Sequence, residues 1–164
     1  MATTLPSAQP AAGRGDELAA LFDDLVRCET RLYNAVGESL RAEHGIVTSQ
    51  FEMLRWLQDH PRSRVADAAA VFAAGVGAVS KGADRLEARG WLRREPNPAD
   101  GRSSLLSLTT AGAALVARAE QTFDDRLGEL VGTALGADQV AATRASLATL
   151  RRALEDAHIG LPVG

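Results

Sequence analysis

The sequence predicts a mainly α-helical fold with one small β-hairpin, which places it in the α+β class. Apolar residues recur at three- and four-residue steps through most of the chain, as they do along a buried helix face. Residues 91–108 depart from this pattern, with two short strand-like runs around a turn rich in Pro, Asn, Asp and Gly. At 164 residues, with 46% apolar and 24% charged side chains, the chain suits a single globular domain.

The two ends of the chain are expected to be tails. Residues 1–15 hold two of the six prolines and no apolar core, so they predict a flexible segment rather than a signal or transit peptide. Residues 158–164 follow the last helical pattern. No run approaches the roughly eighteen apolar residues of a membrane span, and one cysteine excludes an intrachain disulfide. We therefore expect a cytoplasmic protein with no membrane contact.

Two helices are predicted in the first 60 residues. The first spans about residues 16–43 and stops at His44-Gly45. The second begins at Thr48, where Ser49 and Glu52 have the spacing of a capping box, and it ends before Pro61. The apolar stripe of the first helix consists of Leu18, Leu21, Phe22, Leu25, Cys28, Leu32, Val36 and Leu40.

Two shorter helices follow and form a helix-turn-helix signature. A helix at about residues 64–72 is joined to a helix at about residues 76–89 by the tight turn Ala73-Ala74-Gly75. Val79, Ala83 and Leu86 recur at helical spacing and should face the core. The exposed face of the second helix then presents Gly77, Ala78, Ser80, Lys81 and Arg85.

The hairpin beside this helix, residues 91–108, is called the wing below. Residues 91–95 and 102–108 read as its strands, and Arg102 lies at or just past its tip. Asp100 is placed to pair with Arg102 and to orient it. Arg93 and Arg94 point to opposite faces of their strand, so one of them can face a ligand, and we assign that role to Arg94.

Charge along the chain points to nucleic acid as the partner of this helix and wing. The whole chain has a net charge of −3, yet residues 62–102 hold eight basic and five acidic residues, a local charge of +3. A helix face of small and basic residues fits a major groove, and an arginine at a hairpin tip fits a narrow minor groove. The alternative is an ordinary solvated surface with a weak ion pair in the turn.

Two further helices complete the chain. Thr109 or Thr110 can cap a helix that runs to Leu135 before Gly136, and a last helix spans about residues 138–156. The helical regions 16–45 and 109–157 could close a core within one chain, but we favour a homodimer around the winged helix-turn-helix of residues 46–108. A dimer would hold two recognition helices about 34 Å apart and read a palindromic site on double-stranded DNA.

Several of these motifs together resemble the MarR family of bacterial winged helix-turn-helix regulators, over about residues 18–157. The resemblance implies a homodimer joined by the first and the last two helices. It also implies that Ser80, Lys81 and Arg85 occupy the major groove and Arg102 the minor groove. Gly82 departs from the family pattern, which has a larger aliphatic residue there, and the third helix is unusually rich in alanine. The resemblance is carried by Arg85-Leu86-Glu87 through Gly90, the pair Arg93-Arg94, and Asp100-Gly101-Arg102 followed by Leu108-Thr109-Thr110-Ala111-Gly112.

The family resemblance also implies a small aromatic or phenolic effector. Met53, Trp56 and His60 lie on one flank of the second helix and are the candidate contacts, with Arg31 as an anion partner. The alternative is that the Met and Trp side chains belong to the core. Cys28 suggests a second trigger, oxidation, although it lies on the apolar stripe, where a structural cysteine is expected.

Enzyme activity finds no support in the sequence. The three histidines have no metal-ligand spacing, and we find no glycine-rich phosphate loop and no nucleophile motif. We therefore predict no catalytic residue, no metal and no cofactor. The function predicted is a DNA-binding transcriptional regulator, acting as a repressor that a small molecule releases. The alternatives are a winged-helix protein-interaction module that does not bind DNA, and a redox-sensing regulator using Cys28.

Overall fold

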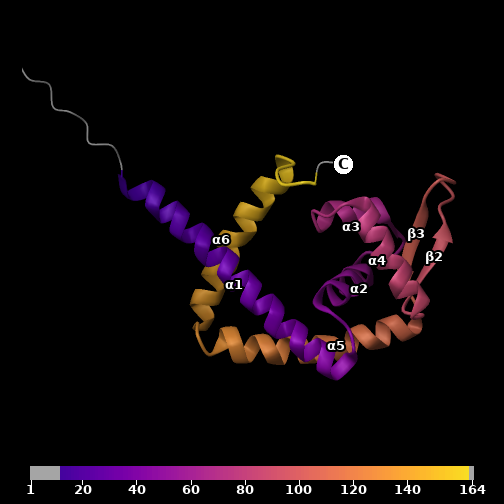
Figure 1. The fold of residues 1–164 in the computed structure, drawn as a ribbon, viewed down its shortest axis with the longest axis horizontal. Coiled ribbons are helices and arrows are strands. Elements are labelled where there is room, and N and C mark those ends of the chain that lie inside the picture. The colour runs from indigo at the N-terminus through magenta and orange to yellow at the C-terminus, as the bar shows by residue number, and fades with distance from the viewer. Residues whose placement is uncertain (1–11, 163–164) are drawn as a thin grey trace, which may run out of the picture.

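The computed structural model describes residues 12–162 and shows a mostly helical chain with one small sheet (Figure 1). The predicted fold class is therefore confirmed. The N-terminal residues 1–11, part of the predicted tail, lie outside the described residues. The elements in order are α1 (Ala12–His44), α2 (Thr48–Asp59), β1 (Ser63–Arg64), α3 (Val65–Val71), α4 (Val76–Ala88), β2 (Leu92–Pro96), β3 (Ser104–Leu108), α5 (Thr110–Leu127), the π-helical turn η1 (Gly128–Gly132) and α6 (Ala137–Asp156).

Helix α1 is longer than the sequence predicted, and its apolar stripe has two different environments. It begins at Ala12, so residues 12–15 are helical and the prediction of a tail there was wrong. In its C-terminal half Val36 and Leu40 are buried, where α1 lies along α5 (Figure 1). In its N-terminal half Leu18, Leu21 and Phe22 are at least 50% exposed, so this part of the stripe has no partner among residues 12–162.

Helix α2 begins as predicted at Thr48, but a different residue caps it. The N-cap is Val47, and its backbone N–H donates to Oε1 of Gln50 at 3.1 Å. The predicted capping box of Ser49 and Glu52 was therefore wrong by two residues. Gln at the third helical position serves here because its side chain reaches back to an N–H that the helix leaves without a partner.

The sheet has three antiparallel strands in the order β1-β3-β2. Strands β2 and β3 form the predicted wing, with Arg94 opposite Leu106. Strand β1 was not predicted, because two residues are too few to show an alternating pattern. It pairs Ser63 with Leu106 and so ties the wing to the start of α3.

One core unites the helix-turn-helix, the wing and the flanking helices α1 and α5. The predicted inward residues of α4 are all buried, as are Phe51, Met53, Leu54 and Leu57 of α2. Phe51 of α2 contacts Phe123 of α5, with ring centroids 5.2 Å apart. The largest fully buried side chains are Phe51, Leu40, Ile46, Leu54, Leu57, Leu86, Leu92, Leu106 and Val116.

Helix α5 begins as predicted and ends earlier. The Thr109 side chain accepts the N–H of Gly112 at 3.0 Å, which confirms it as the N-cap. The α-helix ends at Leu127 rather than near Leu135, and the π-helical turn η1 follows.

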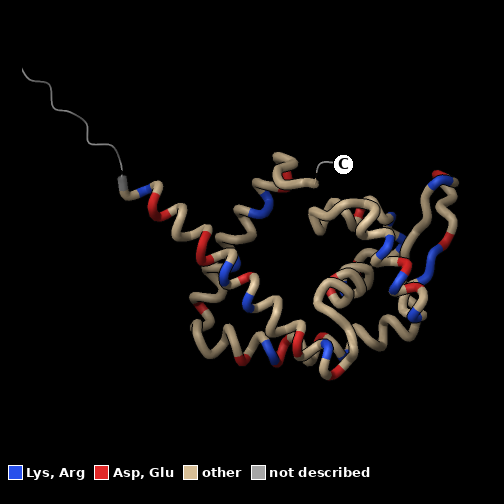
Figure 2. The backbone as a smooth tube through the Cα atoms, in the orientation of Figure 1, with Lys and Arg blue, Asp and Glu red and all other residues tan. Residues whose placement is uncertain are grey.

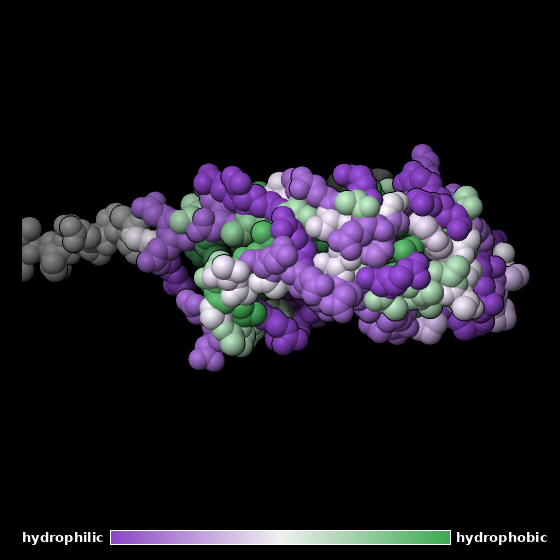
Figure 3. Space-filling view, turned by 90° about the horizontal axis from the view of Figure 1, so that it is seen from below, coloured by the Kyte–Doolittle hydropathy of each residue, from purple (hydrophilic) through white to green (hydrophobic). Residues whose placement is uncertain are grey.

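Helix α6 has no buried residue, although it is 20 residues long. Hydrophobic side chains are exposed where α1, α6 and the end of α5 lie (Figure 3). An isolated helix gains little stability from its own hydrogen bonds, so a helix of this kind needs a packing partner. The exposed apolar residues of α6 and the turn after it are Val140, Leu147, Leu150, Leu154, Ile159 and Leu161.

No single helix of residues 12–162 is long and apolar enough to cross a membrane. Helices α3 and α4 reach that composition only as a pair, across a bend of 115°.

Candidate nucleic-acid interface

Helix α4, which the sequence predicted to be the recognition helix, exposes small and basic residues on one side. Its inward side is fixed by Val79, Ala83 and Leu86, which are 9%, 0% and 1% exposed. The opposite side carries the five α4 residues that the sequence predicted to face a groove. Gly77, Ala78, Lys81 and Arg85 are exposed, and Ser80 is half-buried. Small side chains at the start of the helix leave room for close approach to a surface.

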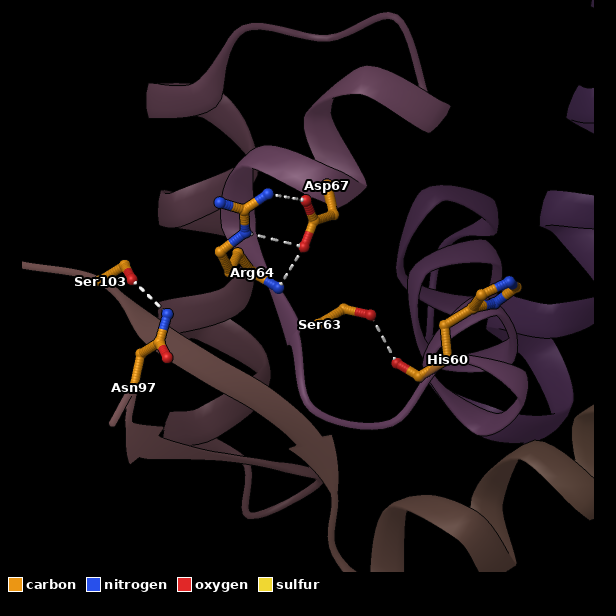
Figure 4. A network of polar contacts seen from close by, with 6 residues as sticks. All are labelled: His60, Ser63, Arg64, Asp67, Asn97 and Ser103. Atoms are coloured by element: carbon orange, nitrogen blue, oxygen red, sulfur yellow. Dashed lines mark hydrogen bonds and ion pairs between the residues drawn. The ribbon is translucent and has the colours of Figure 1, made fainter. Parts of the chain in front are cut away.

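The tip of the wing is held by its own polar contacts. The Asn97 side chain accepts the N–H of Ala99 at 3.0 Å and donates to Oγ of Ser103 at 2.8 Å (Figure 4). Asp100 Oδ1 accepts the backbone N–H of Arg102 at 3.0 Å. These bonds fix the backbone at Arg102, whose side chain is exposed.

The prediction that Asp100 pairs with the Arg102 guanidinium was therefore wrong. The carboxylate binds the backbone of Arg102, two residues on, in an Asx-type turn. Asp100 still orients Arg102, but it does so through the main chain, and the guanidinium keeps its charge available for another partner.

Lys81, Arg85 and Arg102 form no ion pair with any carboxylate in residues 12–162, unlike four other basic residues of this region. Arg62 and Arg93 both pair with Glu95, at 2.5 and 3.1 Å. Arg64 pairs with Asp67, and Arg94 pairs with Asp84 and Glu87. Lys and Arg gather on α4 and along the wing, with acidic residues beside several of them (Figure 2). The positive charge left for a ligand thus lies on the outer face of α4 and at the wing tip.

The Arg94 side chain, which the sequence predicted to face a ligand, is instead bound to α4. Its side chain is 22% exposed and donates to Asp84 at 2.6 Å and to the carbonyl oxygen of Ser80 at 3.2 Å. It also lies 3.3 Å from Glu87, whose other oxygen accepts the Arg94 backbone N–H at 3.1 Å. Through these contacts Arg94 joins β2 to α4. Asp84 and Glu87, three residues apart on a predicted helix, were the sequence signal for this role, but their partner could not be chosen from sequence.

The start of α3 has a similar local pair. Oδ2 of Asp67 accepts the backbone N–H of Arg64 at 2.9 Å, and Oδ1 accepts from Nη2 of Arg64 at 2.6 Å (Figure 4). These hydrogen bonds hold the pKa of Asp67 below its ordinary value. Ser63 donates to the carbonyl oxygen of His60 at 2.8 Å, which closes the turn before β1.

The four predicted effector contacts have different environments. Met53 is 7% exposed and belongs to the core, while Arg31 is exposed on α1. Trp56 is half-buried, stacks on His60 with ring centroids 4.9 Å apart, and meets the edge of Phe72 at 6.1 Å. A depression of about 240 Å³ lies elsewhere, between α1 and the start of α2. It is lined by Tyr33, Asn34, Gly37, Glu38, Arg41, Val47, Thr48 and Ser49.

Cys28 is exposed in the single chain, on the part of the α1 stripe that also exposes Leu18, Leu21 and Phe22. Tyr33, the one tyrosine of the sequence, lies on the same helix. In the described residues no three His, Cys, Asp or Glu side chains gather in a way that could hold a metal ion.

Comparison with known proteins identifies similar chains. A model of the MarR family matches residues 44–103, which include the helix-turn-helix and most of the wing. The multiple antibiotic resistance protein MarR of Escherichia coli is 39% identical over 71 residues, which are 43% of this chain and 49% of that protein. The match thus spans about half the length of this relative. The HTH-type transcriptional repressor NicR of Pseudomonas putida is 26% identical over 113 residues, 69% of this chain and 72% of that protein.

Solved structures match over more of the chain. A mutant of MarR from E. coli, complexed with operator DNA, has a TM-score of 0.74 at 28% identity, covering 85% of this chain and 99% of that one. The transcriptional repressor CouR bound to a DNA duplex has a TM-score of 0.71 at 29% identity, covering 88% and 99%. A MarR family transcriptional regulator from Streptomyces coelicolor, in complex with DNA, has a TM-score of 0.79 and covers 98% of both chains. Its identity is 22%, so it supports the fold alone.

Proposed function

Because the chain belongs to the MarR family of winged helix-turn-helix proteins, we propose that it is a DNA-binding transcriptional regulator that acts as a homodimer in the cytoplasm. The observation that carries the proposal is the placement of three exposed cations, Lys81, Arg85 and Arg102, that form no ion pair or side-chain hydrogen bond within residues 12–162. They lie on the exposed face of α4 and at the tip of the wing, where one rigid body can reach two grooves of a duplex. Members of this family are DNA-binding regulators, which agrees with the prediction that the chain is not an enzyme.

The proposed docking places α4 in the major groove. Gly77 and Ala78 allow close approach, and Ser80 can bind a base edge or a phosphate. Lys81 and Arg85 can donate to guanine or to phosphate oxygens. Arg102 enters the adjacent minor groove, where narrow A·T-rich tracts attract a guanidinium.

For Arg94 and Asp100 we propose supporting roles. Arg94 holds the wing at a fixed angle to α4, so that α4 and Arg102 address their grooves together. Asp100 fixes the main chain under Arg102. Both act on DNA binding through another residue, since their charged groups are already bound within the chain.

The homodimer is supported by the apolar faces that the single chain leaves exposed. Helix α6 buries no residue, and the N-terminal half of α1 exposes Leu18, Leu21 and Phe22. Packing these faces against their copies would remove them from water and hold two winged units side by side. A palindromic operator then follows from the two-fold symmetry.

Repression and release by a small molecule complete the proposal. NicR and CouR are both named as repressors, and a dimer seated on a promoter blocks access to it. The stacked pair Trp56 and His60 offers an aromatic effector a partly exposed surface. Arg31 and Met53 are the other proposed contacts, of which Met53 requires the core to open. This part is tested by titrating benzoate and hydroxybenzoates into a preformed complex of the protein with DNA. If none of them releases the DNA, the proposed effector site at Trp56 is excluded.

A mobility-shift titration tests DNA binding itself. The probe is the DNA upstream of the gene, compared with a scrambled duplex of equal length at two salt concentrations. Binding must weaken as salt rises, because phosphate contacts release counterions. Arg102→Ala should weaken binding to the specific probe and leave the dimer intact, while the control Arg118→Ala removes an equal charge from an exposed position on α5 and leaves binding unchanged. Absence of a salt-sensitive shift would contradict the proposal that the chain is a DNA-binding regulator and would favour a protein-interaction module.

A further inference from the structure

The C-terminal end of α4 makes contacts that the proposed DNA docking does not use. Arg89 is the C-cap of α4, and Gly90 follows with φ of +72°, a left-handed conformation that glycine adopts readily. The N–H of Gly90 donates to the carbonyl oxygen of Glu87 at 2.8 Å, and the N–H of Trp91 donates to that of Leu86 at 3.1 Å. The turn is thus fixed by its backbone, with the Arg89 side chain exposed at the helix end.

The Arg89 guanidinium joins this helix end to the end of α1. Its Nη1 donates to the carbonyl oxygen of Gly45 at 3.2 Å, and its Cζ lies 4.0 Å from the centroid of the Trp91 ring. Gly45 ends α1 with φ of +65°. A cation at the C-terminal end of a helix also complements the negative end of the helix dipole. Arg89 is therefore held by a carbonyl on one side and by an aromatic face on the other.

The ring on which Arg89 stacks belongs to a residue fixed to α5. The carbonyl oxygen of Trp91 accepts the N–H of Thr109 at 3.1 Å, and Oγ1 of Thr109 donates to that of Gly90 at 2.6 Å. Within residues 12–162, the bond from Arg89 to Gly45 is the one side-chain hydrogen bond or ion pair that links α4 to α1 or to the residues between α1 and α2.

We infer that Arg89 is a positioning residue that sets the orientation of α4 relative to α1. The inference rests on the proposed function, in which α1 belongs to the dimer frame and α4 reads DNA. The angle between them then sets the separation of the two recognition helices. Breaking the contact leaves each half able to bind its half-site, but the two halves are no longer held at one spacing.

The test measures affinity against half-site spacing. A half-site is taken from the duplex that the wild type selects from a random library, and two copies are placed with centres about 9, 10, 11 or 12 base pairs apart. A duplex with one half-site is included. The variants are Arg89→Met, which removes the donor and the charge, and Arg89→Lys, which keeps both. Arg93→Met is the matched control, because it removes an equal charge from the neighbouring strand β2 without touching α1.

The expected result is a loss of affinity for the duplex with the preferred spacing, with little change on the single half-site. Arg89→Met lowers affinity about tenfold at the preferred spacing, stays within about twofold on the single half-site, and shows a flattened spacing profile. Arg89→Lys restores the profile, and Arg93→Met shifts all duplexes equally. Equal weakening of every duplex by Arg89→Met, or an unchanged profile, would overturn the inference, as would an Arg89→Lys variant that stays flat. If the wild type itself shows no salt-sensitive binding, the proposed function fails first and the inference fails with it. Thermal unfolding of each variant confirms that it is folded.

Discussion

A methyl group added at Gly112 should loosen the junction between α5 and the wing. Gly112 lies in the first turn of α5 and packs against the backbone of Trp91. A Cβ built there would lie 2.0 Å from the Trp91 carbonyl oxygen, 2.9 Å from its carbonyl carbon and 3.2 Å from its Cα. All three atoms are backbone, so no side-chain rotamer can relieve the overlap.

The magnitude follows from the shift that Gly112→Ala requires. The oxygen must withdraw by about 1 Å, which lengthens the bonds from Thr109 to the carbonyl oxygens of Trp91 and Gly90 beyond useful range. Losing two hydrogen bonds removes about 2 kcal/mol, and the residual overpacking removes about 1–3 kcal/mol. Replacing glycine by alanine within a helix returns about 1 kcal/mol. The free energy of unfolding should therefore fall by about 2–4 kcal/mol, which lowers Tm by about 4–16 °C for a chain of this length.

Gly82→Ala is the matched control. Gly82 lies inside α4, and a Cβ built there meets no atom within 4 Å. The same chemical change should raise stability by up to about 1 kcal/mol, because alanine restricts the unfolded chain and favours helix. Guanidinium unfolding at one fixed protomer concentration compares the variants, since dimerisation makes stability depend on concentration. If Gly112→Ala is as stable as Gly82→Ala, the close contact with Trp91 does not constrain α5 and the reasoning is refuted.

Three further predictions concern the contacts of Arg94 with α4, the dimer and the start of α3. Arg94→Gln should lower the free energy of unfolding by about 1–3 kcal/mol, because it leaves two carboxylates unpaired. The control Arg62→Gln breaks an ion pair whose arginine is more exposed, and it should change the free energy of unfolding by less than about 1 kcal/mol. Equal effects of the two substitutions in chemical unfolding would argue against a role of Arg94 in joining β2 to α4. Leu150→Asp should convert the dimer to monomer in sedimentation experiments, whereas an unchanged mass would exclude α6 from the interface. Since the pKa of Asp67 is lowered, the stability it provides is full above its ordinary value of 3.8 and is lost as pH falls through the depressed value. The difference in stability between wild type and Asp67→Asn should therefore shrink in acid, and a constant difference in unfolding experiments at pH 7 and in acid would contradict this role.

Much of the fold could be predicted because its signals are local. The period of Val79, Ala83 and Leu86 determined which side of α4 is buried, and the turn residues 96–101 located the wing. Thr109 was predicted as a cap because its hydroxyl and the N–H it accepts are three residues apart. The short strand β1 escaped prediction because its pairing with β3 is a long-range contact that two residues cannot signal.

The candidate site shows the same division. The positions of Lys81, Arg85 and Arg102 on an exposed helix face and at a hairpin tip followed from sequence, since each depends on local periodicity or a local turn. The sequence did not predict which of the other arginines are neutralised by ion pairs within the chain.

The sequence by itself determined the helices, the hairpin, their order and the residues on the outer face of α4. The tertiary structure alone decided that Arg94 is bound to α4, that Asp100 holds the main chain of Arg102, and that Met53 lies in the core. The physical reason is distance along the chain. Hydrogen bonds and apolar periodicity within an element depend on residues a few positions apart, whereas the partner of a guanidinium depends on which elements the fold brings within 3–4 Å of it.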